Sequence, residues 1–203
     1  MQEPALFVLA DRRLNEVVQQ IGDDQWSLPI PEWIRLASTT DRSTLTLRDL
    51  VAYHAYDGAW VPDILAGRTM AEVGADRWKA ADLLSDDPKA AFARIVDAAV
   101  AAAESLTPED LQRTAHLSFG DFTVQEYFWQ ITQFRMFRAY ELAVMIGVDP
   151  TIPIELVRGV RAQLEPHIEG WRRIGVFGPE VPVPADASEQ DRLLGLSGRE
   201  PRT

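Results

Sequence analysis

The stretch TVQEYFWQITQFRMFRAYELAVMIG, residues 123–147, determines the fold class because it carries the signals of one long helix. Thr123 and Glu126 have the spacing of a capping box, in which side chains and backbone N–H groups of the first turn bond reciprocally. Apolar side chains then recur at spacings of three and four, which is typical of a helix with an apolar face. Gly147 is placed to end the helix. The stretch therefore predicts a long amphipathic helix.

Three further stretches carry comparable helix signals on the N-terminal side. Residues 47–66 begin within a second capping box, and residues 88–103 begin with the proline of the pair Asp87-Pro88. Residues 6–21 show one apolar face. Residues 107–122 are expected to form a small hairpin or an ordered loop. Four long helices without a series of strands predict an all-α fold, a four-helix bundle over residues 1–150.

Residues 151–203 are expected to form a helical and proline-rich extension that packs on the bundle. A helical pattern runs from Pro153 to about Arg173, and Pro166 predicts a break within it. The prolines of residues 176–184 favour extended backbone. A last short helix is expected over residues 188–194.

Composition excludes several classes of function. The chain has 203 residues, with 20 Lys and Arg against 31 Asp and Glu, and a formal net charge of −11. This charge disfavours nucleic-acid and anionic-membrane partners. The chain has no cysteine, so thiol chemistry would need a small-molecule thiol. No apolar leader and no membrane-length apolar run are present, so we expect a cytoplasmic protein.

Three strings of the sequence carry a family resemblance. They are LTLRDLVAYHAYDGAWVPDILAG at 45–67, AHLSFGDFTVQEYFWQ at 115–130 and GVFGPEVPVPADASEQDRLLGLSGREP at 175–201. The sequence resembles the DinB-like proteins related to mycothiol-dependent maleylpyruvate isomerase. The resemblance implies a DinB-like four-helix bundle with an appended C-terminal segment, and a homodimer formed through its helices. It also implies mycothiol as a thiol cofactor and a divalent metal such as zinc, held by a histidine of the second helix and an acid and a histidine of the fourth.

The three positions that the resemblance assigns to metal ligands hold other residues. Tyr53 stands at the first position, and Phe134 and Arg138 stand at the other two. A phenyl ring cannot coordinate a metal, and a guanidinium repels a cation. We therefore expect no metal and a degenerate metal site. His54, the next residue along, is expected to be a core or interface histidine.

Four residues form the candidate catalytic site. Tyr53 and Asp57 are four residues apart on one helix, and Arg138 and Glu141 are three apart on another, so each pair shares a helix face. If the register follows the family, Arg138 can bind a carboxylate, Tyr53 can donate a proton, and Asp57 or Glu141 can act as base. The alternative is a buried salt-bridge network, with Arg138 paired to Glu141 or Asp57, that serves structure alone. Solvated faces are expected for Arg135, Arg158, Arg161, Arg172 and Arg173.

Three functions remain open at this point. The first is binding or conversion of a small acidic or thiol-linked molecule at the degenerate metal site. The second is a mycothiol-dependent transferase or isomerase that uses a metal, and the third is a non-catalytic bundle that dimerises or binds a partner. An enzyme would be a thiol-dependent transferase or isomerase, or a metal-free acid/base catalyst.

Overall fold

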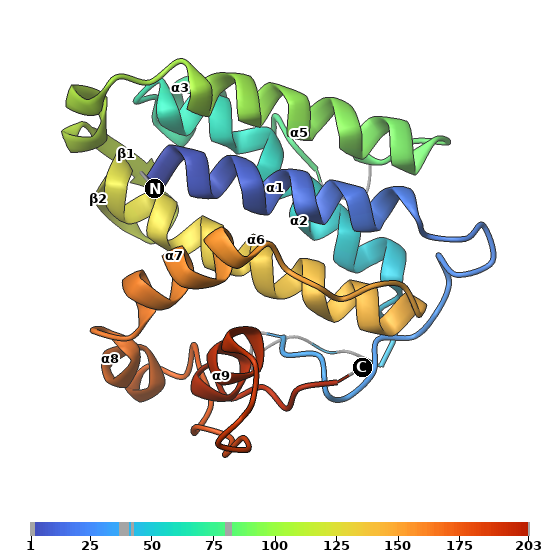
Figure 1. Ribbon diagram of the computed structural model, residues 1–203. Helices are drawn as coiled ribbons and strands as arrows, with labels where there is room; N and C mark the ends of the chain where they lie inside the picture. Colours follow the sequence, from blue (N-terminus) through green and yellow to red (C-terminus); the bar gives the residue numbers. More distant parts are fainter. Residues whose placement is uncertain (1–2, 37–40, 42, 80–82, 203) are drawn as a thin grey trace.

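Four long helices form the body of the protein in the computed structural model, which describes residues 3–36, 41, 43–79 and 83–202 (Figure 1). They are α1 (Glu3–Gln19), α2 (Leu47–Leu65), α5 (Pro88–Glu104) and α6 (Val124–Ile146). α1 packs against α5 and α6, and α2 packs against α5. The short elements are α3 (Met70–Val73), the 3₁₀ helix η1 (Pro108–Gln112), β1 (Thr114–Leu117), β2 (Gly120–Thr123), α7 (Ile154–Leu164), α8 (Ile168–Arg173) and α9 (Glu189–Leu196). The largely helical fold expected from the sequence is confirmed.

Local capping bonds explain where the long helices begin. The backbone N–H of Thr123 donates to the Glu126 carboxylate at 2.8 Å, and the backbone N–H of Thr46 donates to Asp49 at 2.9 Å. Both predicted capping boxes are therefore formed, and they satisfy backbone donors that a helix leaves without partners. α6 ends at Gly147, whose φ of 75° is a left-handed conformation that glycine adopts without steric cost.

A short hairpin departs from the all-α expectation. β1 and β2 pair antiparallel, with Leu117 opposite Gly120, and the second strand leads directly into α6. Residues 107–122 thus begin with the turn of η1 and then form the hairpin, which was one of two conformations that the sequence left open. At the hairpin tip, Phe119 is 69% exposed. The hairpin lies beside the N-terminal end of α6 (Figure 1) and reaches one end of the cavity described below.

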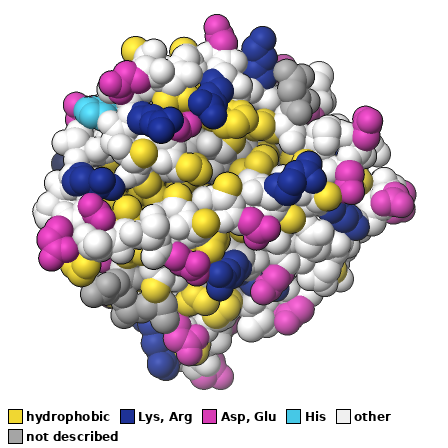
Figure 2. Space-filling model, turned by 90° about the horizontal axis from the view of Figure 1, so that it is seen from above, with side chains coloured by type: hydrophobic (Ala, Val, Ile, Leu, Met, Phe, Trp, Pro, Cys, Tyr) yellow, Lys and Arg dark blue, Asp and Glu magenta, His cyan; other side chains and the backbone are white. Residues whose placement is uncertain are grey.

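One continuous hydrophobic core joins the long helices and the extension. Its largest fully buried aromatic side chains include Phe7 of α1, Phe92 of α5 and Phe128 of α6. Figure 2 shows acidic and basic side chains spread over one face of the molecule, with hydrophobic side chains gathered towards its middle. None of the helices in the described ranges combines the length and the apolar character needed to cross a membrane.

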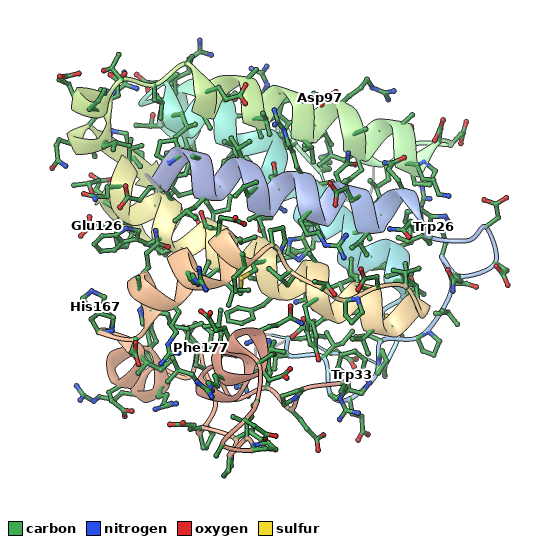
Figure 3. All side chains as sticks on the ribbon, in the orientation of Figure 1. Trp26, Trp33, Asp97, Glu126, His167 and Phe177 are labelled. Carbon is green, nitrogen blue, oxygen red and sulfur yellow. The ribbon has the colours of Figure 1, made fainter. Side chains whose placement is uncertain are left out.

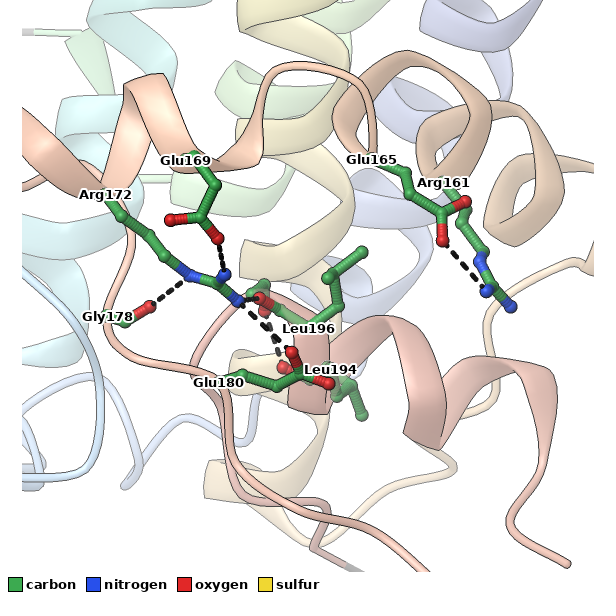
Figure 4. Close-up of polar contacts among 9 residues, drawn as sticks. Arg161, Glu165, Glu169, Arg172, Gly178, Glu180, Leu194 and Leu196 are labelled. Carbon is green, nitrogen blue, oxygen red and sulfur yellow. Dashed lines mark hydrogen bonds and ion pairs between the residues drawn. The ribbon is translucent and has the colours of Figure 1, made fainter. Parts of the chain in front are cut away.

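The C-terminal extension packs on the long helices. α7 contacts α1 and α6, and α9 contacts α7. Arg172 of α8 joins the extension together, because its Nε donates to the Gly178 carbonyl at 3.1 Å and its Nη2 donates to the Leu196 carbonyl at 2.6 Å (Figure 4). The expectation that Arg172 is solvated is therefore wrong. Phe177 of the extension (Figure 3) packs against α6, and its ring centroid is 5.9 Å from that of Phe137.

Substitution of Gly195 by alanine tests how tightly the proline-rich segment packs on α9. A Cβ at Gly195 would lie 2.5 Å from the carbonyl oxygen of Val181, whose own N–H donates to Gly195. We expect Gly195→Ala to lower the free energy of unfolding by about 1–3 kcal/mol, measured by chemical denaturation. Gly170→Ala is the matched control, because nothing lies within 4 Å of its Cβ position, and it should be neutral or slightly stabilising. Equal stability of the two variants would contradict this packing.

Candidate functional site

A cavity of about 580 Å³ lies between α2 and α6. Because α2 packs on α5 and α6 packs on α1, the space between α2 and α6 remains available. Its volume is in the range of ligand pockets, about 300–1,000 Å³. The hairpin tip, residues 35–36 and residues 174–177 complete its walls. All four residues of the predicted site line this cavity, namely Tyr53, Asp57, Arg138 and Glu141.

His54 bridges the gap between the two helices. Arg138 Nε donates to His54 Nε2 at 3.0 Å, and Arg135 Nη1 donates to the His54 carbonyl oxygen at 2.7 Å. Burial and the two guanidinium groups hold the pKa of His54 well below its usual value, so the ring is neutral and Nε2 can accept. His54 is 1% exposed, whereas Tyr53 is 52% exposed, so the prediction of a core histidine is confirmed.

Arg138 is held inside the protein by two hydrogen bonds and one ion pair. In addition to its bond to His54, its Nη1 lies 2.8 Å from Glu141 Oε2, and its Nη2 donates to the Arg35 carbonyl at 3.2 Å. The residue is 4% exposed. Burial lowers the pKa of Arg138, while the Glu141 carboxylate opposes that shift. The predicted pairing of Arg138 with Glu141 is confirmed, and each guanidinium nitrogen already contacts an acceptor of the protein.

Arg135 was expected on a solvated face, and this expectation is wrong. Its side chain is 1% exposed, and its Nε lies 3.2 Å from the carboxylate of Asp11, which is also buried. Burial raises the pKa of Asp11 to about 6, and Arg135 opposes the rise. The sequence holds a signal for this placement, because Arg135 follows Phe128 by seven residues and Ile131 by four, the spacing of one helix face. Arg135 was nevertheless assigned to a solvated face, because charged side chains are mostly exposed.

Arg199 closes one end of the cavity from the C-terminal extension. Its Nε lies 2.8 Å from Glu141 Oε1, so Glu141 pairs with two arginines. Its guanidinium carbon also lies 4.1 Å from the centroid of the Phe137 ring, a cation–π contact. Sequence reasoning did not assign Arg199 to the site, because its position depends on the extension folding back onto α6.

Two charged side chains of the cavity wall have no such partners. Within the described residues, neither the Asp57 carboxylate nor the Arg35 guanidinium makes a hydrogen bond or an ion pair. Burial raises the pKa of Asp57 to about 6, although Arg135 opposes the shift. Burial and the neighbouring Arg199 lower the pKa of Arg35. The Arg35 guanidinium lies against Gly178, where a Cβ would collide with it.

Tyr53 adds a proton donor to the same wall. Burial and the nearby Asp57 carboxylate raise the pKa of its phenol, so the hydroxyl stays protonated at neutral pH. Its ring packs edge-on against Phe134 of α6, with ring centroids 6.1 Å apart. Tyr53 and Asp57 are one helical turn apart on α2. The cavity therefore offers a guanidinium, a carboxylate and a phenol to a bound molecule.

The side chains present do not fit a divalent metal. The three positions that the family resemblance assigns to ligands hold a phenol, a phenyl ring and a guanidinium, at Tyr53, Phe134 and Arg138. The nearby imidazole of His54 already accepts from Arg138 and lies between two cationic groups. Over the described ranges, no cluster of three or more histidine, aspartate or glutamate side chains has the spacing of a metal site.

Substitution of Arg138 tests whether the network holds the two helices in place. Arg138→Ala leaves Glu141 and His54 without one of their partners in a buried setting. We expect the free energy of unfolding to fall by about 3–5 kcal/mol, measured by chemical denaturation. Arg161→Ala is the control, because it removes an exposed pair with Glu165 (Figure 4) and should cost about 0.5 kcal/mol or less. An unfolding free energy of Arg138→Ala equal to that of wild type would contradict a stabilising role of the network.

The raised pKa of Asp57 predicts a pH dependence of stability. A folded-state pKa of about 6 exceeds the unfolded value, so the folded chain binds this proton more tightly. The resulting stabilisation is complete below the unfolded pKa and is lost as pH rises through about 6. From pH 7 to pH 5, the stability of wild type relative to Asp57→Asn should therefore increase by about 1 kcal/mol. Comparison with the variant cancels the titration of Asp11 and His54. A difference that does not change with pH would show that Asp57 has an ordinary pKa.

Comparisons with known proteins found no counterpart for this chain. No protein-family model, no curated protein and no solved structure matches it. The family resemblance therefore rests on the three sequence strings alone, and the function is argued from the cavity and its side chains.

Proposed function

We propose that this chain is a DinB-like, maleylpyruvate isomerase-related four-helix bundle whose cavity binds a small organic acid where the family holds a metal. The observation that carries the proposal is an excess of positive charge at one end of the cavity. Three arginines meet a single carboxylate there: Arg35, Arg138, Arg199 and Glu141. The four groups together leave two positive charges uncompensated.

The energetics of burial favour an anionic ligand at this end. Glu141 is 1% exposed and is shared by Arg138 and Arg199, each at 2.8 Å, so it cannot also neutralise Arg35. Charges that are removed from water need a partner of opposite sign, and a carboxylate can accept two parallel hydrogen bonds from one guanidinium. Arg35 is the group with donors to spare. The role of carboxylate clamp, expected for Arg138, passes to Arg35 in this proposal.

Asp57 and Tyr53 suit proton transfer to a molecule held at Arg35. A carboxyl group with a pKa of about 6 exchanges protons readily near neutral pH. Perturbed carboxylates in a cavity are candidates for acid and base roles. Arg35 would orient the acid, Asp57 would accept or return a proton, and the Tyr53 hydroxyl would donate a hydrogen bond. Arg138 and Glu141 would position the walls of the site. An enzyme of this kind works by metal-free acid/base chemistry on an acid or on its thiol conjugate.

Ligand titration tests the anion site. We expect wild type to bind phenylacetate in the millimolar range, measured by calorimetry, and to prefer it to the neutral phenylacetamide. Arg35→Met should weaken phenylacetate binding at least tenfold, which corresponds to about 1.4 kcal/mol, because the charged partner is lost. Arg12→Met is the control, since Arg12 pairs with Glu104 on the surface outside the cavity and its loss should leave binding unchanged.

Three results would contradict the proposal: no binding to wild type at millimolar ligand, equal affinity for the acid and the amide, or equal affinity of wild type and Arg35→Met. Mycothiol titrated in the same way distinguishes the ligand classes. Binding of mycothiol that does not depend on Arg35 would place a thiol cofactor, and not an acid, in the cavity.

A further inference from the structure

The rim of the cavity is apolar and exposed. Five large hydrophobic side chains are exposed among the described residues, and four of them line the cavity: Tyr53 (52%), Phe119 (69%), Ile174 (71%) and Val176 (45%). They come from α2, from the hairpin tip and from the segment after α8. Single exposed hydrophobic residues are ordinary on protein surfaces, but a concentrated group marks a binding site.

The apolar surface continues from the rim into the cavity. Its wall includes Trp60, Ile64, Phe134, Trp171 and Phe177. The lining residues of α6 run from Tyr127 to Glu141, a span of about 21 Å at the rise of an α-helix. A small acid bound at Arg35 would fill only one end of such a cavity. The rest of the lining is mostly apolar, with Asp57 and Arg68 among its polar members, and it leads to the exposed rim.

We infer that the ligand is an acid with an extended apolar chain, whose carboxylate lies at Arg35 and whose chain runs between α2 and α6 to the rim. The inference rests on the proposed function and specifies its substrate class. Positive charge at one end and a mostly apolar wall over the rest complement the two parts of such a molecule. The rim surrounds the mouth of a cavity. The apolar chain of a ligand can fill that cavity, whereas the flat surface of a membrane or of another protein cannot. The net charge of −11 also opposes contact with an anionic membrane.

A series of straight-chain acids tests the inference. Butanoate, hexanoate, octanoate and decanoate are titrated below their micelle concentrations, by calorimetry, against the full chain. Burial of each added methylene should raise the affinity about threefold to fourfold. Decanol measures binding without a carboxylate and should bind more weakly than decanoate. Affinity that does not rise with chain length would overturn the inference, and butanoate binding that still depends on Arg35 would then leave the proposed function standing.

Rim variants separate a ligand chain from other occupants. Phe119→Ser and Ile174→Ser change exposed side chains, so the fold should persist. We expect each variant to weaken decanoate binding at least threefold and to leave butanoate binding unchanged. Ile154→Ser is the matched control, because Ile154 is the one exposed large hydrophobic residue of the described ranges that does not line the cavity. Sedimentation is measured in parallel. A rim variant that dissociates a dimer without affecting decanoate binding would make the rim an interface between copies and overturn the inference.

Discussion

The hydrogen bond from Arg138 to His54 is the interaction on which the site depends. α2 packs on α5 and α6 packs on α1, and this bond crosses the space between α2 and α6. A buried guanidinium needs partners, and Arg138 makes hydrogen bonds to His54 and to the backbone of residue 35 and an ion pair with Glu141. The contacts with His54 and with residue 35 connect α6 to α2 and to the segment before α2, while the contact with Glu141 lies within α6. His54 must be neutral for the bond to form, and the low dielectric surroundings together with the two arginines keep it so.

The commitment of Arg138 to the protein decides which groups remain for a ligand. A buried ion pair contributes little net stability, because the cost of desolvation offsets its attraction, but its geometry favours one arrangement of the helices. Glu141 pairs with two arginines, and among the residues that the structure describes neither the Arg35 guanidinium nor the Asp57 carboxylate has a partner in the cavity. Under the proposed function, a network at the position where the resembling family holds a metal would also create an anion site beside it. A structural salt-bridge network and a ligand site can therefore both be built from the four predicted residues and their neighbours.

Much of the fold could be predicted because its signals are local. Capping residues mark where α2, α5 and α6 begin, and Pro166 lies between α7 and α8, where a break was expected. Spacing placed each pair of site residues on a shared helix face, and only the register of the resembling family placed both faces at one pocket. All four residues line the cavity, namely Tyr53, Asp57, Arg138 and Glu141. Arg35 and Arg199 could not be found in this way, since their roles arise from contacts between segments far apart in the sequence. The inward position of His54 depends on the rotation of α2, and one residue changes that direction by about 100°.

Nitrogen NMR of the His54 ring tests the central claim most directly. The account predicts a neutral imidazole at pH 7, with Nε2 carrying a lone pair that accepts a hydrogen bond and with no response to added zinc. The Arg138→Met variant should alter the Nε2 signal and leave the chain folded enough to observe it. An imidazolium that titrates near its ordinary pKa, or a signal that shifts when zinc is added, would show that the arginine network does not hold the two helices together.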